Sequence, residues 1–193
     1  NYRDQLASFP QTVWVSEDIL LDLADSQTPQ GIVAVVQKEE VGQADFSQGK
    51  FLFLEDVQDP GNVGTIIRTA DAAGFTGVIV SDKSADIYSL KTLRSMQGSH
   101  FHLPIYRMSS QAILEKAKEA GIPVLATTLS KDSVDYRELP PIENFVLVMG
   151  NEGQGISPLM AESADQLVHI SMKGQAESLN VAVAAGILIF HLR

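Results

Sequence analysis

From Phe51 onward, short apolar runs alternate with stretches of helical periodicity, and this alternation constrains the fold more than any other feature. The apolar runs are Phe51–Leu54, Val78–Val80, Val124–Thr128, Phe145–Met149 and Leu167–Ile170. The helical stretches between and after them are Val63–Ala73, Ser89–Met96, Gln111–Ala120, Pro158–Ser163 and Leu179–His191. This order predicts an α/β fold, a parallel sheet with helices on both faces. Ligands of such folds bind at the carboxyl ends of the strands, where loops lead into helices.

The first 45 residues follow a different pattern and predict a separate unit. Glu17–Leu23 is helical in pattern, Thr28–Gly31 is turn-like, and Ile32–Val36 predicts an apolar strand. The polar segment Gln37–Lys50 predicts a linker. The chain begins with Asn1 rather than methionine, so we expect further residues upstream. The expected division is therefore part of a small α/β domain with its linker in residues 1–45, and a complete domain in residues 46–193.

Composition excludes several classes of protein. With no cysteine, the chain forms no disulfide, thiolate nucleophile or cysteine-based zinc site, and we expect no metal. No apolar run reaches the roughly 18 residues that span a bilayer, and the longest, Val181–Phe190, predicts a buried helix. We therefore expect a cytoplasmic protein that binds no membrane. The net charge of −10 argues against a protein that coats nucleic acid by charge alone.

One segment of this acidic chain is nevertheless basic. This basic segment, Lys83–Arg107, contains one acid, Asp86, and two histidines, His100 and His102. Its cations are Lys83, Lys91, Arg94 and Arg107. A basic segment of this kind can contact the phosphate backbone of a nucleic acid. An ordinary solvated surface explains the same residues, and composition alone leaves both interpretations open.

The loop Asp56–Gly64 directly follows the first apolar run and leads into a helical stretch. Its Asp, Pro, Gly and Asn residues predict a turn. We expect Asn62 to cap the helix and Arg68 to lie about two turns further on. Taken alone, the pattern also fits an ordinary strand–turn–helix junction with a surface arginine.

The loop Met149–Pro158 contains three glycines, which let the backbone approach a ligand closely. Their spacing differs from the G-x-G-x-x-G of dinucleotide-binding folds, and no acidic residue closes a following βαβ unit. A nicotinamide-dependent oxidoreductase is therefore disfavoured. Glu152 within this loop suits a cationic or hydroxyl-rich ligand better than a pyrophosphate.

The loop Ile170–Asn180 precedes the last helical stretch, which is apolar on nearly all sides and therefore predicted to be buried. Ser178 is a suitable N-cap for that helix. The polar side chains of Ser178 and Asn180 at the mouth of a buried helix need hydrogen-bond partners. A ligand or a catalytic neighbour would supply them.

The order and spacing of these three loops resemble those of the SpoU/TrmH branch of the SPOUT RNA methyltransferases, across about residues 50–193. The matching residues are Asp59-Pro60-Gly61-Asn62-Val63-Gly64 with Arg68-Thr69-Ala70, then Gly150-Asn151-Glu152-Gly153-x-Gly155, then Ile170-x-Met172-x-Gly174 with Ser178-Leu179-Asn180-Val181. The chain departs from the family at Ser171, where proline is usual. This departure removes rigidity from the third loop but removes no catalytic side chain.

The resemblance implies a C-terminal trefoil knot, S-adenosylmethionine as cofactor, and an obligate homodimer whose active site draws on both subunits. By the family pattern, the cofactor pocket contains Thr127, Gly150, Ile170, Met172 and Leu179. The catalytic group contains Asn62, Arg68, Glu152, Ser178 and Asn180. Residues 1–45 are similar to the end of the substrate-binding domain that precedes the knot in members acting on ribosomal RNA.

We therefore expect an enzyme that methylates a ribose 2′-hydroxyl of RNA. Large-subunit ribosomal RNA is the expected substrate, because the resemblance implies a leading substrate-binding domain and the given sequence ends with the last helix at Arg193. A transfer RNA methyltransferase and a non-catalytic RNA-binding protein of the same fold are the alternatives. The five catalytic matches argue against the second.

The family pattern makes Arg68 the candidate base, but a free arginine is a poor one. Lowering an arginine pKa from above about 12 to near 8 costs roughly 5–6 kcal/mol. We therefore expect Arg68 to bind the neighbouring phosphate and stabilise the developing alkoxide, while Asn62 and Glu152 hold its guanidinium. The ribose proton then passes to that phosphate or to water, and Ser178 and Asn180 orient the ribose.

Overall fold

The computed structural model describes residues 5–24, 28–38 and 42–193, and the chain divides into two compact units, residues 1–40 and 41–193. In the first unit, α2 (Glu17–Ala24) confirms the predicted helix. The predicted strand over Ile32–Val36 is wrong, since these residues form no strand and Val35 is 99% exposed. An apolar run becomes a strand only beside a partner strand, and the described part of this unit contains none.

The predicted linker is only partly a linker. Residues 39–41 lie outside the described residues, but Ala44 and Phe46 are buried in the core of the second unit. The ring of Phe46 stacks on that of Phe51 with centroids 4.6 Å apart. The end of this segment is therefore anchored to the second unit by apolar packing, which its polar composition concealed.

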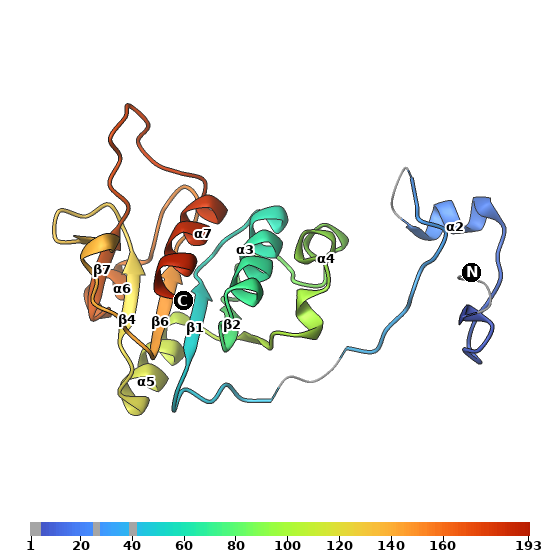
Figure 1. Ribbon diagram of the computed structural model, residues 1–193, viewed down its shortest axis with the longest axis horizontal. Helices are drawn as coiled ribbons and strands as arrows, with labels where there is room; N and C mark the ends of the chain where they lie inside the picture. The colour runs from blue at the N-terminus through green and yellow to red at the C-terminus, as the bar shows by residue number, and fades with distance from the viewer. Residues whose placement is uncertain (1–4, 25–27, 39–41) are drawn as a thin grey trace. The chain divides into compact units, whose positions relative to one another are not determined.

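The second unit is built on a seven-stranded sheet in the order β3-β2-β1-β6-β4-β7-β5, and all its strand pairs are parallel (Figure 1). The strands are β1 (Lys50–Leu54), β2 (Gly77–Val80), β3 (Ile105–Arg107), β4 (Val124–Thr127), β5 (Val134–Asp135), β6 (Phe145–Met149) and β7 (Gln166–His169). The predicted α/β fold with a parallel sheet is confirmed. β3 and β5 were not predicted, because edge strands of three and two residues are too short to show a periodicity.

Helices cover both faces of this sheet. They are α3 (Pro60–Ala72), α4 (Leu90–Met96), α5 (Ser110–Ala120), α6 (Pro158–Ser163) and α7 (Val181–Leu192), with short 3₁₀ helices η1 (Ser99–Phe101) and η2 (Tyr136–Glu138). Leu52 and Leu54 of β1 pack with α3 and α7 on one face, whereas Phe51 and Phe53 pack with α5 and α6 on the other. This alternation along β1 follows from the two-residue period of a strand. α4 packs directly on α3 (Figure 1).

The cap of α3 differs from the prediction. Asp59, not Asn62, is the N-cap, and its Oδ1 accepts a hydrogen bond from the backbone N–H of Asn62 at 2.9 Å. Pro60 occupies the first turn, where its missing N–H costs nothing and its fixed φ favours the helix. The helix therefore begins three residues earlier than predicted. Asn62 lies inside the first turn, and its side chain is available for other contacts.

The cap of α7 also differs. Asn180, not Ser178, caps the helix, because its Oδ1 accepts from the N–H groups of Ala182 at 2.9 Å and Val183 at 3.3 Å. Five residues of α7 are buried, in agreement with its apolar pattern, but Val183 is 53% and Phe190 43% exposed. The helix thus keeps a partly exposed apolar side.

Two features are absent from the described residues. None of their helices combines the length and the apolar character needed to cross a bilayer. Nor do they contain a group of three or more His, Cys, Asp or Glu side chains placed to hold a metal ion.

Candidate active site

A cavity of about 680 Å³ lies at the carboxyl ends of β4, β6 and β7 and at the start of α7. Its volume falls within the range of about 300–1,000 Å³ that small-molecule sites occupy. All five residues that the sequence assigned to a cofactor line this one cavity, namely Thr127, Gly150, Ile170, Met172 and Leu179. The parallel sheet accounts for this convergence, because loops after neighbouring parallel strands emerge at the same edge.

The loop Met149–Pro158, here called the glycine loop, forms one wall of the cavity and is held in a closed turn. Asn151 and Gly155 exchange two backbone hydrogen bonds of 2.9 Å each. A Cβ on Gly150 would lie 2.3 Å from the carbonyl carbon of Gly155, so only glycine fits there. Gly155 has a φ of +70°, which glycine adopts without strain.

Asn151 is a structural residue of this loop that sequence analysis did not single out. Its Oδ1 accepts from the N–H groups of Gly153 at 2.9 Å and Gln154 at 3.0 Å, and its Nδ2 donates to the carbonyl of Asp56 at 2.8 Å. The side chain therefore ties the second loop to the first. Asparagine between glycines is a known turn signal, so the sequence did contain a hint of this role.

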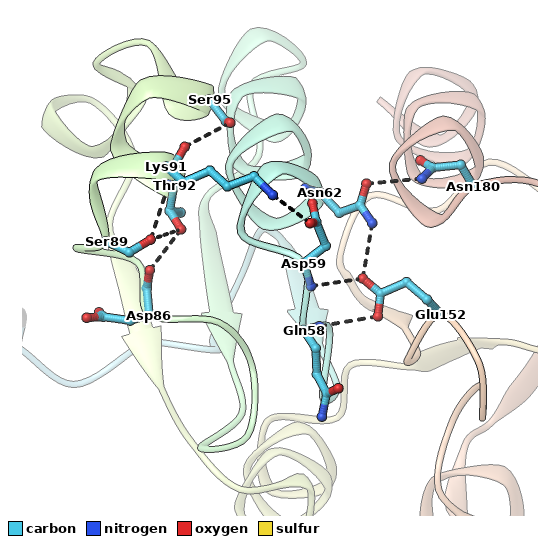
Figure 2. A network of polar contacts seen from close by, with 10 residues as sticks. All are labelled: Gln58, Asp59, Asn62, Asp86, Ser89, Lys91, Thr92, Ser95, Glu152 and Asn180. Carbon is cyan, nitrogen blue, oxygen red and sulfur yellow. Dashed lines mark hydrogen bonds and ion pairs between the residues drawn. The ribbon is translucent and has the colours of Figure 1, made fainter. Parts of the chain in front are cut away.

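Three of the predicted catalytic residues form one hydrogen-bonded chain, although they come from three different loops. Asn62 Nδ2 donates to Glu152 Oε1 at 3.1 Å, and Asn180 Nδ2 donates to Asn62 Oδ1 at 3.1 Å (Figure 2). Glu152 and Asn180 also line the cavity, as does Ser178. Asn62 does not line it but connects the two residues that do. The network therefore forms a polar edge of the cavity.

The carboxylate of Glu152 is surrounded by donors. Besides Asn62, the backbone N–H groups of Gln58 and Asp59 donate to it, each at 3.2 Å. Burial raises the pKa of Glu152, but the hydrogen bonds from Asn62 and the backbone outweigh burial, so the pKa lies below its ordinary value. The charged carboxylate thus holds the start of α3 against the glycine loop.

Replacing Glu152 by glutamine is expected to lower the melting temperature by about 2–4 °C near pH 7, because one N–H donor loses its acceptor. The folded pKa of Glu152 is lowered, so its contribution is fully present above the ordinary value near 4.5 and disappears as the pH falls through the lower folded pKa. Thermal melts of both proteins between pH 7 and pH 3 measure this convergence. Glu162→Gln, an exposed position on α6, is the control. A gap between wild type and Glu152→Gln that stays constant with pH would contradict the assignment.

Arg68 stands apart from this network in its own chain. It lies six residues after Asn62 on α3, which places it about 120° around the helix axis and about 9 Å along it. The residue is exposed and does not line the cavity. The side-chain amide of Asn62 is hydrogen-bonded to Glu152 and Asn180. The expected contacts of Asn62 and Glu152 with the Arg68 guanidinium are therefore not formed within one chain.

The basic segment is partly neutralised by aspartates that lie elsewhere in the sequence. Lys83 pairs with Asp56 at 3.6 Å, Lys91 with Asp59 at 2.8 Å and Arg107 with Asp82 at 3.9 Å. Figure 2 shows Lys91 reaching from α4 to the cap of α3. Aspartates outside the segment therefore oppose cations that Asp86, its own acid, leaves unopposed in the sequence. A role of these four residues in binding RNA stays a prediction.

Ser171, where the sequence departs from the family pattern, is bonded to a neighbouring strand. Its hydroxyl donates to Asp135, a buried residue of β5, and lies 3.3 Å from Nε2 of His169. The Arg137 guanidinium, together with Ser171, holds the pKa of Asp135 well below its usual range. The third loop is therefore tied to β5 by a hydrogen bond to a charged group, in place of the rigidity of a proline.

Comparison with known proteins agrees with this geometry. The SpoU rRNA Methylase family model matches residues 49–190. The 23S rRNA (guanosine(2553)-2′-O)-methyltransferase RlmP of Bacillus subtilis is 45% identical over 183 residues, which cover 95% of this chain and 73% of that protein.

Two solved structures also resemble the chain. An AdoMet-bound rRNA methyltransferase from Sinorhizobium meliloti is 35% identical with a TM-score of 0.79, over 92% of this chain and 69% of that one. The SpoU methyltransferase AviRb from Streptomyces viridochromogenes, solved with AdoMet, is 32% identical with a TM-score of 0.85, over 98% of this chain and 76% of that one. The family match covers well over half of the sequence and includes the loops Asp56–Gly64, Met149–Pro158 and Ile170–Asn180, so this chain belongs to the SpoU rRNA methylase family.

Proposed function

We propose that this protein transfers a methyl group from S-adenosylmethionine to a ribose 2′-hydroxyl of ribosomal RNA. The observation that carries the proposal is the single cavity in which five expected cofactor residues meet three of the expected catalytic side chains. The Bacillus subtilis relative methylates a guanosine 2′-oxygen of 23S rRNA, and it shares 45% of its aligned residues with this chain.

The residues of the cavity fit an adenosine-containing cofactor. Ile170, Met172 and Leu179 provide apolar surface for a base, and the glycine loop brings backbone groups to the wall. Glu152 and Asn180 provide polar groups at one edge. When bound, S-adenosylmethionine supplies a methyl group on a positively charged sulfur.

The side chains at the cavity then perform the alignment that the transfer requires. Ser178 and Asn180 bind the ribose and aim its 2′-oxygen at the methyl carbon, which contributes several kcal/mol through positioning. Arg68 binds the adjacent phosphate and stabilises the negative charge that develops on the oxygen. The 2′-oxygen forms a bond to carbon as the bond to sulfur breaks, and its proton passes to that phosphate or to water. Glu152 and Asn62 keep Asn180 in place through their hydrogen bonds.

Arg68 does not line the cavity of its own chain. The protein therefore acts as a homodimer, in which each cavity receives Arg68 from the partner subunit. The exposed position of Arg68 on α3 and the partly exposed apolar residues Val183 and Phe190 of α7 support this arrangement. We also propose that the segment before α7 completes a trefoil knot. Residues 1–45 then belong to a substrate-binding domain, and Lys83, Lys91, Arg94 and Arg107 contact the RNA backbone.

Calorimetry with S-adenosylmethionine, followed by transfer of a labelled methyl group to RNA, tests the proposed function. We expect one binding site per chain and incorporation of label into 23S rRNA, mapped to a 2′-oxygen. Label in transfer RNA alone would move the substrate to that class. Binding of RNA without any binding of the cofactor would reduce the protein to a non-catalytic RNA-binding member of the family.

A further inference from the structure

Glu55 is a buried acidic residue for which the proposed reaction has no direct use. It directly follows β1 and is only 3% exposed. Its Oε1 accepts from the hydroxyls of Ser110 at 2.5 Å and Ser157 at 2.7 Å, and its Oε2 accepts from the backbone N–H of Ser157 at 2.8 Å. Both carboxyl oxygens are therefore hydrogen-bonded to residues that do not line the cavity.

The partners of Glu55 stand at both ends of the glycine loop. The backbone N–H of Glu55 donates to the carbonyl of Met149 at 2.9 Å, and Met149 is the residue before Gly150. Ser157, whose hydroxyl and backbone N–H both donate to the Glu55 carboxylate, closes the same loop and caps α6. One residue thus fixes the point where the loop leaves β6 and the point where it enters α6. The loop between them forms a wall of the cavity.

A carboxyl group is well suited to this place. Burying it without partners would be costly, but three hydrogen bonds compensate the loss of water. α5 begins at Ser110 and α6 follows Ser157, so the carboxyl group bridges the starts of two helices. The group is therefore held rigidly, and it transmits that rigidity to the loop.

We propose that Glu55 is a positioning residue that sets the width of the glycine loop, and with it the affinity of the cavity for S-adenosylmethionine, through Ser157. The proposal rests on the proposed function, since it concerns the same cofactor. It predicts that the two contacts of Glu55 differ in their consequences. The Ser157 contact acts on the cavity wall, whereas the Ser110 contact leads only to α5.

Alanine substitutions at the two serines separate these contacts. We expect Ser157→Ala to raise the Kd and the KM for S-adenosylmethionine about ten-fold, and Ser110→Ala to change them less than about two-fold, although each removes a hydroxyl from the same oxygen. At saturating cofactor, kcat should stay within about two-fold of wild type in both, because no side chain that touches the ribose has changed. Ser157→Thr, which keeps the hydroxyl, should restore the affinity.

Two further variants control for capping and folding. Ser157 also caps α6 by accepting from Met160, so Ser109→Ala, which removes the equivalent cap of α5, measures the effect of losing a cap. Glu55→Gln keeps the shape and can still accept from the N–H of Ser157, so we expect an intermediate rise in Kd of about three-fold. Melting temperatures of all variants identify those whose loss of affinity follows from unfolding.

The two proposals fail in different ways. A wild-type protein that binds no S-adenosylmethionine overturns the proposed function, and this inference with it. If wild type binds the cofactor but Ser157→Ala and Ser110→Ala have the same affinity, Glu55 stabilises the fold without positioning the loop, and the inference alone is overturned. The same conclusion follows if Ser157→Thr remains as weak as Ser157→Ala.

Discussion

Replacing Gly150 by alanine is expected to weaken S-adenosylmethionine binding about a hundred-fold or more, the loss that corresponds to roughly 2.7 kcal/mol. The added Cβ would lie 2.3 Å from the carbonyl carbon of Gly155 and 2.5 Å from the backbone nitrogen of Ile156. Both atoms belong to the backbone, so no side-chain rotation relieves the clash. The loop must open, and the wall of the cavity is lost. Calorimetric titration with the cofactor measures the effect.

A second glycine in the same loop provides the matched control. A Cβ on Gly153 would meet only Asn151 Oδ1, at 3.7 Å, which is an ordinary contact. Gly153→Ala should therefore bind the cofactor within about three-fold of wild type, although it makes the same chemical change three residues away. Equal affinities of Gly150→Ala and wild type would show that the cofactor does not occupy this cavity. Melting temperatures distinguish a distorted loop from an unfolded protein.

Replacing Arg68 by alanine is expected to lower kcat by about 10²–10³-fold, in the range found when one group that stabilises developing negative charge is removed. Arg68 neither lines the cavity nor contributes to the network of Asn62, Glu152 and Asn180, so cofactor affinity should remain near that of wild type. Arg68→Lys should retain measurable activity, because a lysine keeps the charge but loses the bidentate geometry. Complete loss of turnover in Arg68→Lys, with intact cofactor and RNA affinity, would instead favour an arginine-specific base or bidentate contact. Single-turnover methyl transfer at saturating cofactor and RNA measures the chemical step.

Mixing two variants that each lack one expected catalytic side chain decides whether Arg68 acts on the partner subunit. If it does, a dimer of Arg68→Ala with Asn180→Ala contains one intact site, and random exchange of subunits should restore about one quarter of wild-type activity. Each variant alone supplies the baseline. If Arg68 acts within its own chain, both sites of the mixed dimer are defective. Activity that stays at the baseline after demonstrated subunit exchange would therefore refute the shared site.

The strands and helices around the site were largely predictable from local patterns. β6 and α6 have the predicted bounds, since Phe145–Met149 is a continuous apolar run and Pro158 follows a serine cap. Local signals were misread at two helix starts. Asp59 before Pro60 is a stronger cap signal than Asn62, and Asn180 rather than Ser178 is adjacent to the first residue of α7.

The pairings at the site were not predictable. Asn62 and Glu152 are 90 residues apart, and Asn62 and Asn180 are 118 residues apart, yet both pairs are hydrogen-bonded. The family pattern grouped these residues, but Asn62 and Glu152 were expected to hold the guanidinium of Arg68. The sequence also did not indicate that Lys83 and Lys91 form ion pairs with Asp56 and Asp59 of the first loop. A sequence shows the charge of each residue but not its neighbours.

The sequence by itself determined the alternation of strands and helices, the three loops at the strand ends and the residue types in those loops, because apolar periodicity and turn propensity act over a few neighbouring residues. Only the tertiary structure decided which polar groups meet: Glu152 with Asn62, Glu55 with Ser157, and Asn151 with Asp56. Hydrogen bonds form only within about 3.5 Å and in favourable directions. Distances of that size between remote segments are set by the packing of parallel strands and their helices, which no local pattern records.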